Sequence, residues 1–110
     1  MNTIFHINES NKWTTLFSNV THMNKWMQST ATTGTIEVLV NGSAVSDVVK
    51  NSDINLSQLT NMGIMVAVCN NSLVQRDIKT DSLQANLQVV PVGVVELAAK
   101  QIAGYAYIKP

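Results

Sequence analysis

The chain has 110 residues, with seven basic side chains, seven acidic side chains and a formal net charge of zero. A chain of this length is predicted to form one domain, over residues 1–110, that buries about two-thirds of its unfolded surface without a metal or a disulfide. The balanced charge argues against nucleic-acid binding, no tract has the roughly 18 apolar residues that span a membrane, and the single cysteine excludes an internal disulfide and a multi-thiolate zinc site.

The first third of the chain joins two short apolar runs through one long amphipathic segment. We predict a strand over residues 3–8 and a helix over residues 9–28, because the apolar side chains of the second segment recur at intervals of three and four residues. The sequence STATTG at residues 29–34 is typical of a loop. A β-branched run at residues 35–40 predicts a second strand, and an Asn-Gly pair ends it.

The middle third is predicted to contain one strand between short helices. Residues 43–50 begin with a capping serine and indicate a short helix, and residues 53–61 indicate a second one. Residues 64–68 are almost wholly apolar, which is typical of a strand that is covered on both faces. A short helix is expected over residues 70–76, and residues 77–86 are only weakly patterned.

The last third completes an alternation of strands and helices. We predict a fourth strand over residues 87–90, closed by Pro91, a helix over residues 92–103, ended by Gly104, and a final strand over residues 105–108. Five strands that alternate with helices predict the α/β class, with a mainly parallel sheet and helices on both of its faces.

Polar and small residues follow four of the predicted strands. Because ligands of open parallel sheets bind beyond the carboxyl ends of the strands, these residues are the expected lining of a pocket. They are Asn8, Glu9, Asn41, Gly42, Cys69, Asn70, Asn71, Pro91 and Gly93. Turns have a similar composition, so both interpretations of this pattern stay open.

Cys69 is the sharpest candidate for chemistry. It directly follows an apolar strand and precedes Asn70, a residue that commonly caps a helix. A thiol at a strand-to-helix junction faces the positive end of the helix dipole, which favours the thiolate and lowers the pKa of the thiol. The alternative is a buried structural cysteine, since free cysteine is among the most buried residue types.

The two histidines and Glu9 are weaker candidates. His6 lies inside the first strand, where it is either a core histidine bonded to a backbone group or a base near the exit of the sheet. Glu9 is either an acid at the rim of the pocket or a first-turn acid that the helix dipole stabilises. His22 lies off the apolar stripe of its helix and is expected at the surface.

The chain contains none of the motifs of hydrolases, zinc peptidases or nucleotide-binding enzymes. We therefore expect no metal and no cofactor. The N-terminus has no basic segment followed by a long apolar run, so no signal peptide is predicted and a soluble, cytoplasmic protein is expected.

Two features point to self-association. Trp26 lies off the apolar stripe of its helix, and the helix over residues 92–103 is apolar on nearly all sides. With charged residues at only 13%, against about 25% in typical domains, the chain is expected to bury this surface in a homo-oligomer. The alternative is a monomer with a generous core.

Five blocks of sequence carry a resemblance to a known family. They are IFHINE with the following KW, EVLVNG, VAVCNN, VVPVGVVEL and the terminal GYAYIKP. Together they resemble the DsrE/DsrF-like family of small sulfur-relay proteins, in particular its poorly characterised single-domain branch. The resemblance spans essentially the whole chain, and its two C-terminal blocks are quite specific for that branch.

The resemblance implies a three-layer α/β/α, flavodoxin-like domain that assembles into trimers or hexamers. It also implies a role in sulfur relay, because better-known relatives carry sulfur as a persulfide on a cysteine in a strand-end loop and pass it between donor and acceptor proteins. Cys69 matches the position of a cysteine that recurs in this branch. The chain is then a sulfurtransferase-like persulfide carrier, with His6 and Asn8 expected to line the cavity.

Two other classes of function stay open at this stage. One is a small-molecule-binding or regulatory oligomer that uses the same strand ends, with Cys69 only packing there. The other is a structural oligomer with no site of its own. An unreactive, fully buried Cys69 favours the first, and a pocket lined by the strand-end residues argues against the second.

Overall fold

The structure is a computed structural model that describes residues 1–110, and its centre is one sheet of five parallel strands. Their order across the sheet is β4-β3-β2-β1-β5, and every neighbouring pair is parallel. The predicted α/β class with a parallel five-stranded sheet is therefore confirmed. The strands are β1 (Thr3–Ile7), β2 (Ile36–Val40), β3 (Met65–Cys69), β4 (Gln88–Val90) and β5 (Ala106–Ile108).

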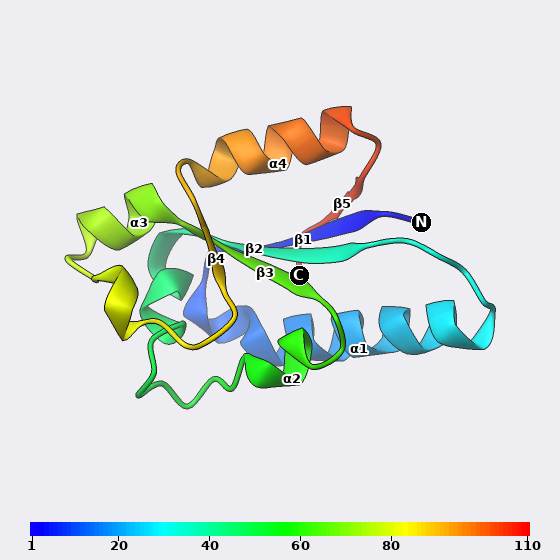
Figure 1. Ribbon diagram of the computed structural model, residues 1–110, viewed down its shortest axis with the longest axis horizontal. Coiled ribbons are helices and arrows are strands. Elements are labelled where there is room, and N and C mark those ends of the chain that lie inside the picture. The colour runs from blue at the N-terminus through cyan, green and yellow to red at the C-terminus, as the bar shows by residue number, and fades with distance from the viewer.

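Four α-helices connect the strands, as Figure 1 shows. Three short 3₁₀ helices accompany them: η1 (Ser10–Lys12), η2 (Gly42–Asp47) and η3 (Thr80–Ser82). The α-helices are α1 (Trp13–Ser29), α2 (Ser57–Thr60), α3 (Asn70–Gln75) and α4 (Gly93–Ile102). None of these helices is long and apolar enough to cross a membrane.

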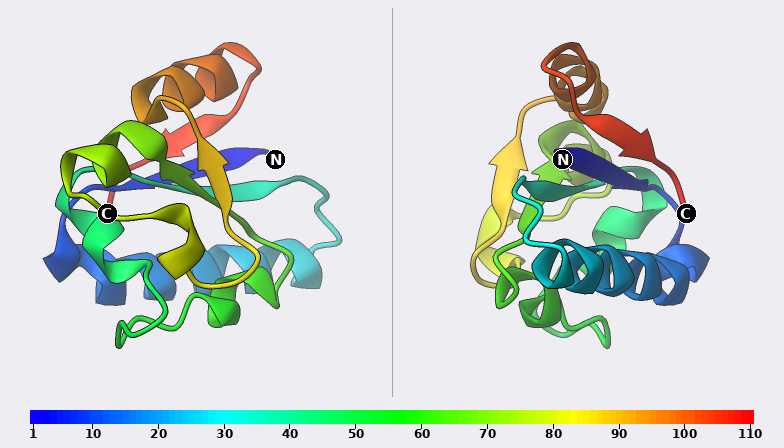
Figure 2. Two further views of the ribbon diagram at one scale, coloured as in Figure 1. Left: turned by 60° about the vertical axis from the view of Figure 1, so that its left-hand side comes forward. Right: turned by 90° about the vertical axis from the view of Figure 1, so that its right-hand side faces the viewer.

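The direction of each crossover decides which face of the sheet each helix covers. The chain steps from β1 to β2, β3 and β4 in one direction, and then returns past β1 to form β5 on the other edge. Because parallel crossovers are right-handed, a reversal of direction places the connecting helix on the opposite face. Figures 1 and 2 show the result: α1 and α2 lie on one side of the sheet, and α4 lies alone on the other.

The two faces are unequally filled. On the side of α1, 19 buried apolar residues form the main core, which includes Leu73 of α3 and Leu83 after η3. On the side of α4, the buried cluster consists only of Ile4, Leu39, Ala67 and Leu97. The sheet face under α4 is therefore covered by few apolar side chains, and polar side chains also lie on this face.

Several predicted helices are shorter than expected. The helix predicted from residue 9 begins at Trp13, after the turn of η1, because the backbone of Glu9 is extended. The helix predicted over residues 43–50 is the 3₁₀ helix η2, and the one over residues 53–61 is reduced to the single turn of α2. Helix propensity does not sustain longer helices in these short connections.

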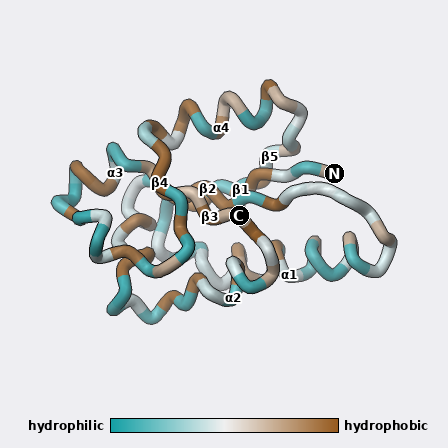
Figure 3. Tube along the Cα trace, viewed as in Figure 1, coloured by the Kyte–Doolittle hydropathy of each residue, from teal (hydrophilic) through white to brown (hydrophobic).

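Most of the apolar surface of helix α4 is exposed in the single chain. Only Gly93 and Leu97 of this helix are buried, although the helix is apolar on most sides. Val94, Val95 and Ile102 are 61%, 60% and 87% exposed. Figure 3 shows hydrophobic positions recurring along α4 at the outside of the molecule.

Candidate functional site

Four polar side chains form a row across the carboxyl end of the sheet. The parallel register pairs Val40 with Val68, so the next residues lie side by side: Asn41, which directly follows β2, and Cys69, the last residue of β3. His6 of β1 contacts Asn41 on one side and Tyr107 of β5 on the other. The order along the row is therefore Tyr107, His6, Asn41 and Cys69, from four adjacent strands.

The alternation of side chains along a strand places this row on the face that α4 covers. Ile4, Leu39 and Ala67 pack against Leu97 of α4. The residues two positions later on the same strands point to the same face, and these are His6, Asn41 and Cys69. The row therefore lies next to the N-terminus of α4.

His6 links its two neighbours by short hydrogen bonds. Its Nδ1 atom lies 2.6 Å from the Tyr107 hydroxyl, and its Nε2 atom lies 2.7 Å from Asn41 Oδ1. An amide oxygen only accepts, so the Nε2–H group donates to Asn41 and the Tyr107 hydroxyl donates to Nδ1. Burial lowers the pKa of His6 and the charge of Lys109 lowers it further, against the opposing effect of the Asn41 hydrogen bond. The imidazole is therefore held in its neutral form.

Cys69 is buried among hydrogen-bond donors. Only 4% of the residue is exposed, and the Gly93 N–H at the start of α4 donates to Sγ across 3.2 Å. Burial by itself raises the pKa of the thiol, but the Ser72 hydroxyl and the amides of Ser72, Gly93 and Asn71 outweigh it, and the pKa of Cys69 lies below its ordinary value. The site therefore favours the thiolate.

Gly93 approaches the row so closely that no side chain fits there. A Cβ atom at this position would lie 3.0 Å from the Cys69 Cβ, 3.3 Å from Leu39 Cδ1 and 3.4 Å from the Asn41 Cβ. The absence of a side chain lets the N-terminal turn of α4 sit directly over Asn41 and Cys69. It also brings the Gly93 amide within hydrogen-bonding distance of the sulfur.

One detail of the predicted junction is wrong. Asn70 was expected to cap α3, but Cys69 occupies the N-cap position with an extended backbone, and Asn70 is the first helical residue. The thiol thus stands where an N-cap side chain ordinarily accepts hydrogen bonds from the first-turn amides. Sγ makes no capping hydrogen bond in α3, but the nearby amides of Ser72 and Asn71 contribute to lowering the pKa of Cys69.

Cys69 also lies where the topology of the sheet predicts a crevice. The connection after β3 packs into the core on the side of α1, through Leu73 and Leu83, whereas the connection after β4 leads to α4 on the opposite face. Adjacent parallel strands whose connections separate in this way open a ligand crevice at their carboxyl ends. Cys69 ends β3, and Gly93 follows β4.

The other predicted site residues divide into two groups. Asn8 and Gly42 pack beside the row: Gly42 has a positive φ of 58°, and a Cβ on it would lie 3.1 Å from the Asn8 carbonyl oxygen. Glu9, Asn71 and Pro91 are exposed and Asn70 is half-buried, and no side-chain hydrogen bond joins any of the four to the row. His22 is exposed on α1.

Two residues of the site were not among those predicted. Ser72 lowers the pKa of Cys69, and its Oγ accepts a hydrogen bond from the Gly42 amide at 3.0 Å. It lies in the first turn of α3, three residues after Cys69, so the predicted short helix after the strand already placed it near the thiol. Tyr107 joins the row only because β5 pairs with β1, and no local pattern indicates that pairing.

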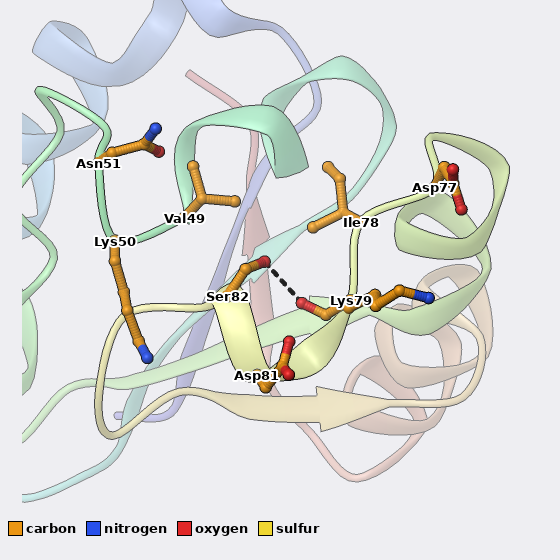
Figure 4. A pocket seen from close by; sticks show the side chains of 8 residues that line it. All are labelled: Val49, Lys50, Asn51, Asp77, Ile78, Lys79, Asp81 and Ser82. Atoms are coloured by element: carbon orange, nitrogen blue, oxygen red, sulfur yellow. Dashed lines mark hydrogen bonds between the residues drawn. The ribbon is translucent and has the colours of Figure 1, made fainter.

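The largest cavity of the molecule lies away from this row. It has a volume of about 510 Å³ and is lined by Val49, Lys50, Asn51, Asp77, Ile78, Lys79, Asp81 and Ser82. Figure 4 shows that the ammonium groups of Lys50 and Lys79 point in different directions, and that the Ser82 hydroxyl is bonded to the Lys79 carbonyl. These charged groups do not converge on a common point, so the cavity does not present a catalytic arrangement.

A smaller cavity adjoins the row. Its volume is about 150 Å³, and Val90, Pro91, Val92, Val95 and Glu96 line it. Val90 is the register partner of Cys69 on β4. The structure contains no group of three or more His, Cys, Asp or Glu side chains arranged to hold a metal ion.

A buried carboxylate lies under α4, further from the carboxyl end of β2. Glu37 is fully buried, its Oε1 atom lies 3.4 Å from Lys100 Nζ, and neither carboxylate oxygen has a hydrogen-bond partner. Burial, together with Glu96, raises the pKa of Glu37 to about 7, against the opposing charge of Lys100. This group holds α4 on the sheet in a pH-dependent way.

With the fold and the row described, comparison with known proteins identifies the family. The model of the DsrE/DsrF-like family matches residues 20–110, which is most of the chain. The chain belongs to the DsrE/DsrF-like family. This finding confirms the resemblance seen in the sequence.

Solved structures of similar proteins share the fold of this DsrE-like chain. A protein of unknown function from Methanobacterium thermoautotrophicum, MTH1491, is 27% identical, with a TM-score of 0.88 over 99% of this chain and 98% of that one. The ychN protein from E. coli is 16% identical, with a TM-score of 0.71 over the full length of both chains. BT1422 from Bacteroides thetaiotaomicron, a conserved protein of unknown function, is 12% identical, with a TM-score of 0.72 over 99% and 94%. A comparison with curated proteins found no match.

Proposed function

We propose that this DsrE-like protein carries sulfur as a persulfide on Cys69 within a sulfur relay. The observation that supports the proposal most is the Gly93 N–H, which donates to Sγ across 3.2 Å, together with a pKa of the buried thiol that lies below its ordinary value. The thiolate is the form of cysteine that attacks sulfur. The family of the chain agrees with this chemistry.

The proposed step is a transfer of one sulfur atom without net oxidation. The Cys69 thiolate attacks the outer sulfur of a donor persulfide, R–S–SH, and forms a new S–S bond. The S–S bond of the donor breaks at the same time, and R–S⁻ leaves with the electron pair. Cys69 then holds the sulfur as –S–SH, and a thiolate of an acceptor protein takes it by the same reaction.

The burial of Cys69 determines which donors react. With 4% of the residue exposed, Sγ is accessible to a small persulfide more readily than to a bulky one. The small cavity beside the row borders the approach to Sγ, and it is lined by Val90, Pro91, Val92, Val95 and Glu96. We therefore expect donor and acceptor proteins to present their sulfur on an extended segment that enters between β4 and α4.

Mass spectrometry tests the proposal. The wild-type chain is incubated with a small persulfide donor, and the mass is expected to increase by one sulfur atom at Cys69, the only cysteine. The Cys69→Ser variant is the control and is expected to remain unchanged. An unmodified wild-type chain, or equal addition to both chains, would rule out the carrier function.

The burial of the thiol also supports a second candidate function, a small-molecule-binding or regulatory module in which Cys69 only packs. In that case the strand-end crevice still binds a ligand, but the thiol does not react. Alkylation separates the two candidates, because a packing cysteine is modified only at the rate of global unfolding.

We also propose that the chain forms a homo-oligomer through α4. The exposed side of this helix carries Val94, Val95, Ala98, Ala99 and Ile102, with Gln101 as its polar residue. The charged residues of the helix, Glu96 and Lys100, are only partly exposed. An uncharged apolar surface offers no electrostatic selection for a different partner, whereas a second copy supplies the same apolar surface. Trimers and hexamers are the expected forms.

A further inference from the structure

One hydrogen-bond donor in the row has no partner. Asn41 accepts from His6 through Oδ1, and its backbone N–H donates to the Ile7 carbonyl at 3.1 Å. Its Nδ2 amino group makes no hydrogen bond in the structure. A half-buried amide that leaves two N–H groups unused at the edge of a crevice is available to a bound group.

The orientation of this amide follows from its neighbours. Two arrangements of the row are self-consistent. In the first, Tyr107 donates to Nδ1 and Nε2–H donates to Asn41 Oδ1; in the second, the Asn41 amide is turned over, so that Nδ2 donates to Nε2 and Nδ1–H donates to the Tyr107 oxygen. A phenol is a better donor than acceptor, and an amide oxygen is the strongest acceptor available. The first arrangement is therefore favoured, and it matches Oδ1 facing the ring at 2.7 Å.

Because Oδ1 faces β1, the amino group of Asn41 is on the side away from His6. On that side lies Cys69, the next residue of the row, and Gly93 contacts both of their Cβ atoms from above. The backbone donors already act on Sγ itself. A persulfide places a second sulfur about 2.0 Å beyond Sγ, and this outer atom carries the charge when the persulfide ionises.

We propose that the Asn41 amino group donates to the outer sulfur of a Cys69 persulfide, and that His6 and Tyr107 are positioning residues that keep the amide in this orientation. This assignment rests on the persulfide function proposed above. In this proposal β5 also contributes to the site: Tyr107 fixes the orientation of His6, and His6 fixes the orientation of the Asn41 amide.

The test uses a persulfide made chemically, so that it does not depend on uptake from a donor. Cys69 is converted to an aryl disulfide in urea and the chain is refolded. Hydrosulfide then displaces the aryl thiolate and leaves Cys69–S–SH. The pH at which the persulfide ionises is followed by its ultraviolet absorbance, and the ionisation of the unmodified thiol is measured separately by its alkylation rate.

In the Asn41→Leu variant we expect the acid dissociation constant of the persulfide to fall about tenfold, which is the effect of one hydrogen bond to a charged group. Tyr107→Phe is expected to cause a smaller decrease, about threefold. The unmodified thiol should ionise as in the wild type in both variants, because Nδ2 does not donate to Sγ. Tyr105→Phe is the matched control and should change neither value.

Two results would overturn the assignment. One is an Asn41→Leu persulfide that ionises like the wild type, and the other is an equal change in the unmodified thiol, which would indicate general damage to the site. A ¹⁵N NMR measurement of the unmodified chain gives an independent test: His6 is expected to carry its proton on Nε2, and a proton on Nδ1 contradicts the proposal. If the wild type accepts no sulfur from a donor, only the carrier function fails.

Discussion

At the scale of single residues, burial and hydrogen bonding have opposite effects on the pKa of Cys69. Removing a thiolate from water disfavours its charge, and an apolar surrounding would keep the thiol protonated. Here the amide of Gly93 and the hydroxyl of Ser72 reverse that outcome. Each donor is therefore separately testable by substitution.

The substitution Ser72→Ala removes the donor with the largest lowering effect on the pKa of Cys69. We expect the pKa of the thiol to rise and the alkylation rate near neutral pH to fall by roughly tenfold, which corresponds to one hydrogen bond to a charged group. The measurement is the rate of iodoacetamide modification followed by mass spectrometry. Ser46→Ala, at an exposed position of η2, is the control, and the same rate in both variants would contradict the prediction.

The substitution Gly93→Ala tests the close approach of α4. Its Cβ would lie 3.0 Å from the Cys69 Cβ, so the first turn of α4 must move away. We expect a loss of about 1–3 kcal/mol in the free energy of unfolding, the usual cost of an overpacked contact, and a higher pKa of Cys69. Val74→Ala, at a valine on α3 that is 67% exposed and lies outside the proposed interface, should leave both unchanged. Urea denaturation that shows a fully stable Gly93→Ala chain would contradict this account.

At the scale of elements, α4 buries few of its own side chains and packs over a buried carboxyl group. Leu97 is its only large buried side chain, and Lys100 reaches the buried Glu37 at 3.4 Å. A buried carboxylate without hydrogen bonds is costly when ionised. The attachment of α4, and with it the Gly93 amide, therefore depends on pH.

The pH dependence has a definite sign. Glu37 has a pKa of about 7 in the folded chain, above its ordinary value. As the pH falls, the folded chain therefore binds a proton at Glu37 before the unfolded chain does. Stability from this group is present below the ordinary pKa and is lost as the pH rises through 7. The difference amounts to at most about 3 kcal/mol. We expect Glu37→Gln to remove this dependence, measured as the difference in the free energy of unfolding by urea between about pH 5 and about pH 8. Glu9→Gln, at an exposed position, is the control and should keep the dependence of the wild type. The same difference in all three chains would contradict the prediction.

The sequence predicted some elements well because their signals are local. The apolar run before Cys69 and the three-and-four spacing of α1 identify a strand and a helix directly. The predictions were less accurate for the short connections, where helices were expected and the structure has the 3₁₀ helix η2 and the single turn of α2. In such connections tertiary packing determines whether one turn or a longer helix forms. Tyr107 could not be placed in the site, because only the long-range pairing of β5 with β1 brings it to His6.

At the scale of the whole molecule, one reversal of chain direction produces both the crevice and the exposed helix. The return from β4 to β5 places α4 alone on its face, beside Cys69 and without a second helix to cover its outer side. The proposed sulfur site and the proposed subunit interface thus share one element. Assembly of the chain is therefore expected to influence access to Cys69.

A charged residue introduced on α4 tests the proposed subunit interface. We expect Val95→Lys to weaken self-association at least tenfold, as substitutions of central interface residues do. Sedimentation velocity at several protein concentrations measures the change. Val74→Lys, at a valine on α3 that is 67% exposed, is the matched control and should leave the assembly intact. A wild-type chain that sediments as a monomer at all concentrations would exclude the interface.

The pH dependence of Cys69 alkylation is the decisive measurement, because a stabilised thiolate underlies the carrier function. The thiol is the only one in the chain, so its modification is followed without ambiguity. The account predicts a single ionisation with a midpoint below the ordinary thiol value of about 8.5, and an alkylation rate well above that of global unfolding. A midpoint at or above that value, or modification only on unfolding, would contradict it.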